Sequence, residues 1–162
     1  MNIVLCGFMG CGKTSVGKNL AKITGRPFVD TDELIEEEQS IPISEIFSLY
    51  GENYFRNLEF EMCKKVSKMD NVIVSTGGGA MTFDRNVKAL KENGVVVFLD
   101  VPFNIICKRI GDGNTRPLFK DKSKAKKLYY ERQSKYEKAA DFTLNGNLSS
   151  KKVAKIIAEK FN

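Results

Sequence analysis

The chain has 162 residues, of which 42% are hydrophobic and 28% charged, and its formal net charge is +6. These values are typical of one globular domain and exclude a disordered or fibrous chain, so we expect a single domain over residues 1–162. The sequence has no histidine, which excludes Ser-His-Asp and Cys-His catalysis, and its four cysteines lack the spacing of a zinc site. Any metal ion must therefore be held by oxygen atoms.

The chain offers no segment for a membrane. Its longest unbroken apolar run, residues 95–99, has five residues, whereas a helix that crosses a bilayer needs about 20. The residues after Met1 also lack the basic and apolar regions of a signal peptide. We therefore expect a cytoplasmic protein with no membrane partner.

The charge is unevenly distributed along the chain. Residues 30–61 contain ten acidic side chains and one basic one, whereas residues 108–138 contain eleven basic and four acidic ones. The basic stretch is consistent either with a solvated helix or with a site for phosphates or another anionic small molecule.

Short apolar runs alternate with helical patterns. The runs are bounded by Gly, Asn, Asp or Pro, and they predict strands at 3–6, 28–29, 72–75, 95–99 and 142–144. The intervening patterns predict helices at 15–24, 44–50, 52–69, 84–93, 102–110, 123–139 and 150–160. Strands that are apolar on both sides and alternate with helices are typical of a parallel sheet covered on both faces. We predict a three-layer α/β fold.

A phosphate-binding motif follows the first predicted strand. Residues 7–14 read Gly-Phe-Met-Gly-Cys-Gly-Lys-Thr and match G-x-x-x-x-G-K-[ST], with a helical pattern directly behind them. The glycines let backbone N–H groups converge on phosphate oxygens, and Lys13 can reach the β and γ phosphates. Thr14 can offer its hydroxyl to Mg²⁺. The sequence therefore predicts binding of ATP or GTP.

Two carboxylates end the second predicted strand, Asp30 and Asp32. In open α/β sheets, ligands bind beyond the carboxyl ends of the strands, which places this pair near the phosphate loop. One Asp can hold Mg²⁺ through water and the other can accept a hydroxyl proton. The alternative is that Asp32 only caps the next helix.

The third predicted strand ends in Ser-Thr-Gly-Gly-Gly, residues 75–79. Many phosphate-loop proteins have a Mg²⁺-binding Asp at this point, so here the metal carboxylate must come from elsewhere. Three consecutive glycines allow a ligand to approach bare backbone, although an ordinary flexible turn has the same composition.

Arg56 lies in a strongly acidic helical segment, with Glu59 three residues later on the same face. An arginine that a neighbouring glutamate holds in place is suited to bind a carboxylate ligand. The alternative is that Arg56 and Glu59 form an ordinary surface salt bridge. Phe47 and Phe55 are expected in the core by default, and either can wall a substrate pocket.

The run 111–122 has little apolar content and several turn formers, which predicts a mobile loop and a candidate lid. Arg116 within it is suited to reach a transferring phosphate. Arg132 lies on the following helix, where a solvated basic face is the alternative.

Taken in order, these motifs resemble those of the shikimate kinase family: residues 10–14, Asp30-Thr31-Asp32, Phe55-Arg56-x-x-Glu59, residues 75–79 and Arg116-Pro117-Leu118. The resemblance covers nearly the whole chain. It implies transfer of the γ-phosphoryl of ATP to the 3-hydroxyl of shikimate, in the pathway to chorismate and the aromatic amino acids. It also implies a fold like that of nucleoside monophosphate kinases, with a five-stranded parallel sheet, a substrate-binding segment at about 31–61 and a closing lid.

The resemblance further implies roles for individual residues. ATP would be bound by Gly10, Cys11, Gly12, Lys13, Thr14, Ser15 and Arg116, with Arg109 stacked on adenine. One Mg²⁺ would be held by Thr14 and, through its water shell, by Asp30. Catalysis would rest on Lys13, Asp32 and Arg116. Where the family often has an arginine after the last strand, this chain has Asn-Gly-Asn-Leu at 145–148.

Shikimate would be bound through its carboxylate by Arg56 and Arg132, through its hydroxyls by Asp32, and by the backbone of Gly78. The remaining residues expected around it are Gly77, Gly79, Phe47, Phe55 and Glu59. The partners expected are therefore shikimate and ATP, with no nucleic acid, and the family suggests a monomer.

Two alternatives remain open from the residues. Another small-metabolite kinase, such as a gluconate kinase, would share the phosphate loop and an acidic pair. A nucleotide-gated binding module or nucleic-acid protein could instead use the loop as a switch and the basic stretch 108–138 as its contact surface.

Overall fold

Five strands form one parallel sheet in a computed structural model that describes residues 1–111 and 120–161. The order is β2-β3-β1-β4-β5, and each neighbouring pair is parallel. The strands are β1 Asn2–Cys6, β2 Phe28–Asp30, β3 Ile73–Ser75, β4 Gly94–Asp100 and β5 Phe142–Asn145. Each overlaps a predicted strand, which confirms the predicted α/β fold.

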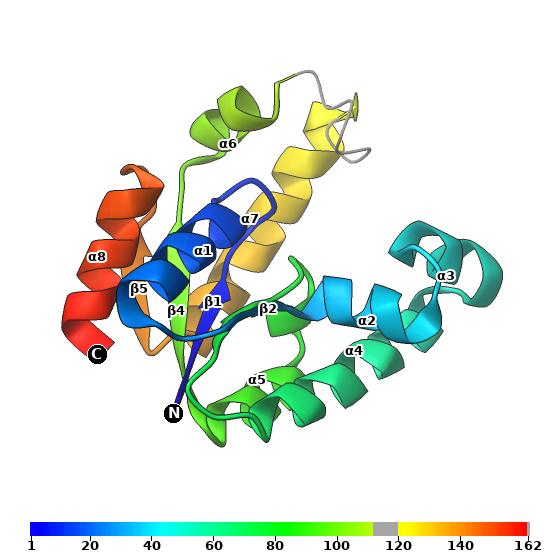
Figure 1. Ribbon diagram of the computed structural model, residues 1–162. Helices are drawn as coiled ribbons and strands as arrows, with labels where there is room; N and C mark the ends of the chain where they lie inside the picture. The colour runs from blue at the N-terminus through cyan, green and yellow to red at the C-terminus, as the bar shows by residue number, and fades with distance from the viewer. Residues whose placement is uncertain (112–119, 162) are drawn as a thin grey trace.

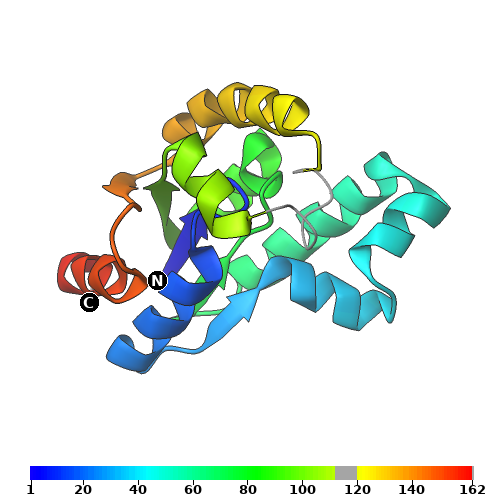
Figure 2. The same ribbon diagram turned by 90° about the horizontal axis from the view of Figure 1, so that it is seen from above.

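Eight α-helices and one short 3₁₀ turn, η1, connect and cover the described strands. They are α1 Lys13–Thr24, α2 Thr31–Gln39, α3 Ile43–Tyr50, α4 Glu52–Ser67, η1 Ala80–Thr82, α5 Asp84–Lys91, α6 Phe103–Ile110, α7 Lys122–Ala139 and α8 Ser150–Phe161. Seen from above, α1 and α8 lie on one side of the sheet and α7 on the other (Figure 2). Helices α2 and α3 project away from the sheet beyond β2 (Figure 1).

The core is centred on β1. All five of its residues are buried, and they pair with β3 on one side and β4 on the other. A strand flanked on both edges and covered on both faces favours apolar residues, which explains the run Ile-Val-Leu-Cys at 3–6. Residues of β3 and β4 continue this core, and Val16 and Leu20 of α1 pack onto it.

The register brings three carboxyl ends to one edge of the sheet. Leu5 of β1 pairs with Ser75 of β3, and Ser75 in turn pairs with Asp30 of β2. The segments that leave these strands therefore start side by side, although they are far apart in the sequence. They are the phosphate loop, the triple-glycine turn (Gly77–Gly79) and the acidic pair.

Helix α2 was not among the predicted helices. Its only large apolar residues are Leu34 and Ile35, too few to mark a 3.6-residue period in a segment that is otherwise polar. Its start is fixed by Asp30, whose Oδ1 accepts hydrogen bonds from the backbone N–H groups of Asp32 and Glu33 at 2.9 and 3.2 Å. The helix cap considered for Asp32 therefore belongs to Asp30.

Residues 112–119, with Arg116 and most of the predicted lid, lie outside the described part of the chain. Within the described part, no helix combines the length and the apolar character needed to cross a bilayer.

Candidate active site

The phosphate loop turns directly into α1. Gly12 caps this helix with a φ of 102°, a left-handed conformation that side-chain-bearing residues rarely adopt. Helix α1 starts at Lys13, two residues before the predicted start, so Thr14 and Ser15 lie in its first turn. Unpaired N–H groups and the positive end of the helix dipole therefore face the loop, as an anion site requires.

Lys13 is held inside its own loop. Its Nζ donates to the carbonyl oxygen of Gly7 at 2.6 Å and to that of Phe8 at 3.3 Å. The ammonium group thus lies at the centre of the loop, where its charge can reach phosphate oxygens.

One cavity of about 340 Å³ joins the motifs at the carboxyl ends of β1, β2 and β3. The predicted site residues that line it are Gly10, Gly12, Lys13, Thr14, Ser15, Asp30, Asp32, Gly77, Gly78 and Arg109. Cys11 is buried beneath the loop and lines an adjoining hollow of about 270 Å³, with Arg109, Gly146 and Leu148.

Arg109 connects the loop to the segment after β5. Its Nη1 donates to the carbonyl of Cys11 at 3.1 Å, and its Nη2 donates to that of Gly146 at 3.0 Å. The arginine therefore lies between the cavity and the adjoining hollow, and it lines both.

Asp32 is the carboxylate with the most perturbed environment in this cavity. Burial, together with the nearby negative charges of Asp30 and Glu59, raises the pKa of Asp32 to about 6, while Lys13 acts in the opposite direction. Near pH 7 it is ionised, but it is a far better proton acceptor than an ordinary aspartate.

Each glycine of the triple-glycine turn lies against one predicted substrate residue. A Cβ at Gly77 would come within 2.7 Å of the Asp32 carboxylate, one at Gly79 within 2.7 Å of the Arg56 guanidinium, and one at Gly78 within 3.3 Å of Arg132 Nη1. None of the three has a positive φ. Space, and not backbone conformation, therefore favours glycine here: a Cβ at Gly77 or Gly79 would push on the facing side chain, and one at Gly78 would need only a small shift. We call Gly77–Gly79 together with Asp32, Arg56 and Arg132 the glycine corner.

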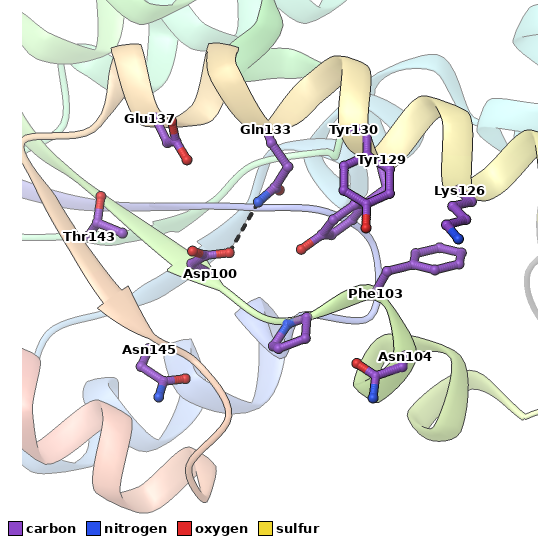
Figure 3. A pocket seen from close by; sticks show the side chains of 11 residues that line it. Asp100, Phe103, Asn104, Lys126, Tyr129, Tyr130, Gln133, Glu137, Thr143 and Asn145 are labelled. Carbon is purple, nitrogen blue, oxygen red and sulfur yellow. Dashed lines mark hydrogen bonds between the residues drawn. The ribbon is translucent and has the colours of Figure 1, made fainter.

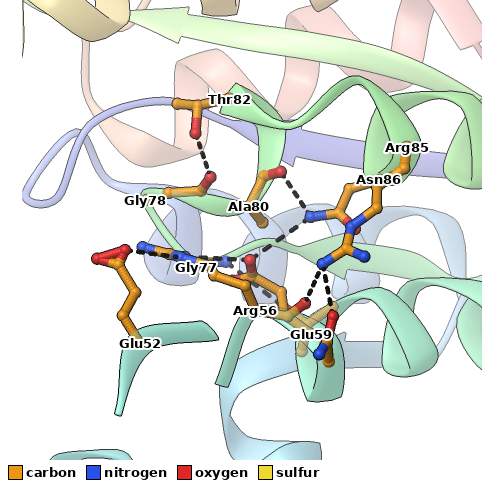
Figure 4. Close-up of polar contacts among 12 residues, drawn as sticks. Glu52, Arg56, Glu59, Gly77, Gly78, Ala80, Thr82, Arg85 and Asn86 are labelled. Atoms are coloured by element: carbon orange, nitrogen blue, oxygen red, sulfur yellow. Dashed lines mark hydrogen bonds and ion pairs between the residues drawn. The ribbon is translucent and has the colours of Figure 1, made fainter. Parts of the chain in front are cut away.

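Arg56 is fixed by a buried partner. Its Nη1 lies 3.0 Å from Glu59 Oε1, and only 15% of the arginine side chain and 1% of the glutamate side chain are exposed. The pair is therefore not the surface salt bridge considered as an alternative. Burial raises the pKa of Glu59, against the opposing effect of Arg56. Figure 4 shows this pair below the triple-glycine turn.

Aromatic rings enclose the Arg56 guanidinium. Its Cζ lies 5.3 Å from the centre of the Phe55 ring and 5.1 Å from that of Phe83. Phe55 is buried and its ring centre lies 4.8 Å from that of Phe47, which is half-buried. Phe55 thus serves both the core and the wall around Arg56.

Arg132 is half-buried, so the solvated basic face considered for it does not describe its position. Its guanidinium lies 6.0 Å from the ring centre of Phe8 in the phosphate loop. One helical turn later, the buried Tyr136 donates a hydrogen bond from its hydroxyl to the carbonyl of Gly78. Helix α7 is therefore fastened to the same turn that Arg132 faces.

The glycine corner leaves polar atoms without a hydrogen bond. Among the described residues, the buried side-chain atoms without a hydrogen-bond partner are Asp32 Oδ1, Arg56 Nε and Asn86 Oδ1. Two of the three belong to the corner. Arg56 Nε has an ion-pair contact with Glu52 Oε2 at 3.9 Å, which is beyond hydrogen-bond distance. Buried polar groups are normally hydrogen-bonded, so an acceptor and a donor without hydrogen bonds are typical of a site that a polar ligand completes.

Sequence reasoning missed Phe83, Asn86 and Tyr136. Tyr136 carries a usable signal, because it lies four residues after Arg132 and so shares its helix face. Phe83 and Asn86 follow the triple glycine by a few residues, and no periodic pattern distinguishes them.

A larger hollow of about 820 Å³ lies between α6, α7 and the ends of β4 and β5 (Figure 3). Its polar contacts include a hydrogen bond from Gln133 Nε2 to Asp100 Oδ1 at 3.1 Å. It contains none of the predicted site residues, so size alone does not locate the site.

Comparison with known proteins agrees with this geometry. The family model described as shikimate kinase matches residues 9–162. The chain is 43% identical to the shikimate kinase of Thermodesulfovibrio yellowstonii over 99% of this chain and 94% of that one, and 40% identical to the shikimate kinase of Caldicellulosiruptor bescii over 94% and 90%. The solved structure of the Acinetobacter baumannii shikimate kinase in complex with shikimate superposes with a TM-score of 0.89 at 33% identity, over 99% of this chain and 95% of that one. The chain belongs to the shikimate kinase family, whose members are ATP-dependent kinases that phosphorylate a hydroxyl group.

Proposed function

We propose that this protein transfers the γ-phosphoryl group of ATP to the 3-hydroxyl of shikimate, giving 3-phosphoshikimate and ADP. The observation that carries the proposal is the meeting of two sites. The phosphate loop, Asp32, Gly77 and Gly78 line one cavity, and Arg132 and Arg56 lie against Gly78 and Gly79 of the same turn. A small acid with several hydroxyls needs such a combination of charges.

The nucleotide belongs on the phosphate-loop side. Backbone N–H groups of residues 10–15 and the Lys13 ammonium are placed to bind the β and γ phosphates, which would replace the carbonyls of Gly7 and Phe8 as partners of Nζ. The hollow beside Arg109 has room for the base, and Gly146 and Leu148 also line it.

The residues around the loop fit a magnesium ion carried by the nucleotide. Mg²⁺ in kinases is held by one or two protein oxygens and by phosphates, and Thr14 and Asp30 both line the cavity beside Lys13. Asp30 caps α2 through Oδ1, so Oδ2 is the oxygen that remains for the metal's water shell. When bound, the ion would neutralise charge on the phosphates.

The acceptor belongs in the glycine corner. Arg56 and Arg132 face the turn from α4 and α7 and are suited to clamp the shikimate carboxylate, with Gly79 beside Arg56 and Gly78 beside Arg132. Glu59 keeps Arg56 oriented, and Phe55 limits the space on its other side.

Asp32 is placed to handle the reacting hydroxyl. It lines the cavity with Lys13, and its buried, unpaired Oδ1 can accept the hydrogen bond of a hydroxyl group. Phosphoryl transfer depends mainly on positioning and charge, so orienting this hydroxyl is the main task, with proton acceptance as the reaction proceeds. Arg116, outside the described residues, would stabilise the transferred phosphate, and the segment 111–122 would close over it.

We further propose that the protein works as a monomer in the cytoplasm. Its described cysteines are free thiols, and three of the four are buried, in keeping with a reducing compartment. Sedimentation at several protein concentrations tests the monomer.

The experiment that tests the function is a coupled ADP-release assay with Mg²⁺ and ATP. Shikimate, gluconate, nucleoside monophosphates and no acceptor are compared. ADP release that depends on shikimate alone is the expected result. ATP binding without turnover of shikimate would keep the phosphate loop and remove the acceptor assignment.

A further inference from the structure

Asn86 is a buried residue beside Glu59, the carboxylate that pairs with Arg56. It belongs to α5, and only 1% of it is exposed. Its Nδ2 donates to the carbonyl of Ala80 at 2.8 Å and lies 3.5 Å from Glu59 Oε1 (Figure 4). One amide nitrogen therefore reaches both the segment that follows the triple-glycine turn and the carboxylate that holds Arg56.

The orientation of this amide is fixed by its neighbours. Both groups beside Nδ2 are acceptors, a carbonyl and a carboxylate, so the nitrogen and not the oxygen must face them. Asn86 Oδ1 has no hydrogen-bond partner among the described residues. A buried amide oxygen without a partner lowers stability, so the side chain is best explained by its two donated hydrogens.

The buried Glu59 carboxylate needs a second hydrogen-bond donor, and Asn86 supplies one. Its other hydrogen-bond donor among the described residues is Arg56, whose Nη1 contacts both carboxylate oxygens at 3.0 and 3.3 Å. A carboxylate that is 1% exposed is poorly solvated, and a second donor at Oε1 favours the ionised form and limits its rotation.

Through Ala80, Asn86 is also connected to the triple-glycine turn. Ala80 donates its N–H to the carbonyl of Gly77 at 3.1 Å, and Gly79 leaves no room for a Cβ beside Arg56. The turn and the guanidinium therefore approach each other closely, and a small rotation of Glu59 would move Arg56 relative to the turn.

We infer that Asn86 is a positioning residue for the acceptor site: it ties Glu59, and through it Arg56, to the triple-glycine turn. The inference rests on the proposed function, in which Arg56 binds the acceptor carboxylate. Asn86 itself touches neither the cavity nor the acceptor.

The structure offers a matched control. Asn2 is also a buried asparagine with 1% exposure, and its Nδ2 donates to the carbonyls of Val66 and Met69. It lies at the amino end of β1, whereas the phosphate loop follows the carboxyl end. Asn2→Ala removes a comparable buried amide without touching the glycine corner.

The test combines steady-state kinetics with a double-mutant cycle, below the melting temperature of every variant. Asn86→Ala is expected to raise the KM for shikimate about tenfold, the size of a lost hydrogen bond to a charged group, with the KM for ATP unchanged. Asn2→Ala is expected to lower thermal stability but to leave both KM values within about twofold of wild type.

The cycle asks whether Asn86 acts through Glu59. In a Glu59→Gln background, Asn86→Ala is expected to raise the KM for shikimate by less than about twofold, because the carboxylate that it holds is already gone. A full tenfold rise in that background, or an unchanged KM in the single Asn86→Ala variant, would overturn the inference. Wild-type protein that fails to phosphorylate shikimate would instead overturn the proposed function.

Discussion

The phosphate loop and the glycine corner meet at one cavity, which Asp32, Gly77 and Gly78 of the corner line, but the two regions satisfy their charges differently. On the loop side, Lys13 of the loop and Arg109 of α6 already donate to backbone carbonyls. In the corner, Asp32 Oδ1 and Arg56 Nε are buried and have no hydrogen-bond partner among the described residues. On the proposed assignment, nucleotide binding would exchange existing hydrogen bonds, whereas acceptor binding would add new ones to a prearranged site.

The largest expected effect comes from the corner. Asp32→Asn keeps the shape but removes the proton acceptor, so kcat should fall by about 10²- to 10⁴-fold while the KM for ATP stays unchanged. The measurement is the coupled ADP assay. A kcat within about twofold of wild type would remove Asp32 from the reaction.

The same variant should be more stable than wild type. The pKa of Asp32 is raised from 3.8 to about 6 in the folded protein, so ionised Asp32 destabilises the fold at pH 7. Asp32→Asn should then increase the free energy of unfolding by on the order of 2 kcal/mol at pH 7, and this difference should shrink as the pH falls from 6 toward 4. Urea denaturation at several pH values measures it.

Arg56→Ala separates the two substrates. Losing the charged partner of a carboxylate should raise the KM for shikimate by about 10- to 100-fold and leave the KM for ATP unchanged. Arg26→Ala is the matched control, since Arg26 donates to the carbonyl of Met1, away from the cavity. Equal effects on both KM values would contradict the separation into two sides.

Lowering the pH should reduce turnover of shikimate through protonation of Asp32 in the glycine corner. With a pKa of about 6 for Asp32, kcat/KM for shikimate should fall about tenfold for each pH unit below 6 as the carboxylate takes up a proton. The residual activity of Asp32→Asn should lack this slope. A flat wild-type profile between pH 5 and 7 would show that the step does not need the ionised carboxylate.

Larger side chains in the triple-glycine turn should raise the KM for shikimate, and more so where the added atom lies closer to its neighbour. Gly79→Ala places a methyl group 2.7 Å from the Arg56 guanidinium and should raise the KM for shikimate about fivefold to tenfold, whereas Gly78→Ala, at 3.3 Å from Arg132, should have a smaller effect. Gly17→Ala is the control: its methyl group would meet the Phe28 ring, so stability and not KM should change. The reverse order of the first two variants would refute the spatial argument.

The smallest effect is expected on the nucleotide side. Arg109→Ala removes two hydrogen bonds to carbonyls at the rim of the cavity and should raise the KM for ATP about threefold to tenfold, with the KM for shikimate unchanged. A change in the shikimate KM alone would contradict the assignment of Arg109 to the nucleotide side of the cavity.

The sequence predicts much of this architecture because the strands are short apolar runs between turn formers. It predicts neither the strand order nor α2, whose Leu34 and Ile35 carry too little periodicity. The order of the strands depends on which edges pair, and that is a property of the whole sheet.

The site was predictable to the extent that its residues lie in motifs. The phosphate loop, the acidic pair and the Arg56–Glu59 spacing are local patterns, and the structure brings them together. The matching of each glycine to one opposing side chain is not local, since Gly78 and Arg132 are 54 positions apart in the chain. Asn86 was missed for the same reason, because its importance depends on what it faces.

The fit of the triple-glycine turn also bears on inhibitor resistance. A compound that binds against this turn would face three positions where an added Cβ would lie 2.7 to 3.3 Å from Asp32, Arg56 or Arg132. The simplest escape route, a bulkier side chain that blocks the drug, would at the same time displace the groups that hold the natural acceptor. Resistance through these positions should therefore carry a loss of fitness, which makes the backbone of Gly77–Gly79 a durable surface to target.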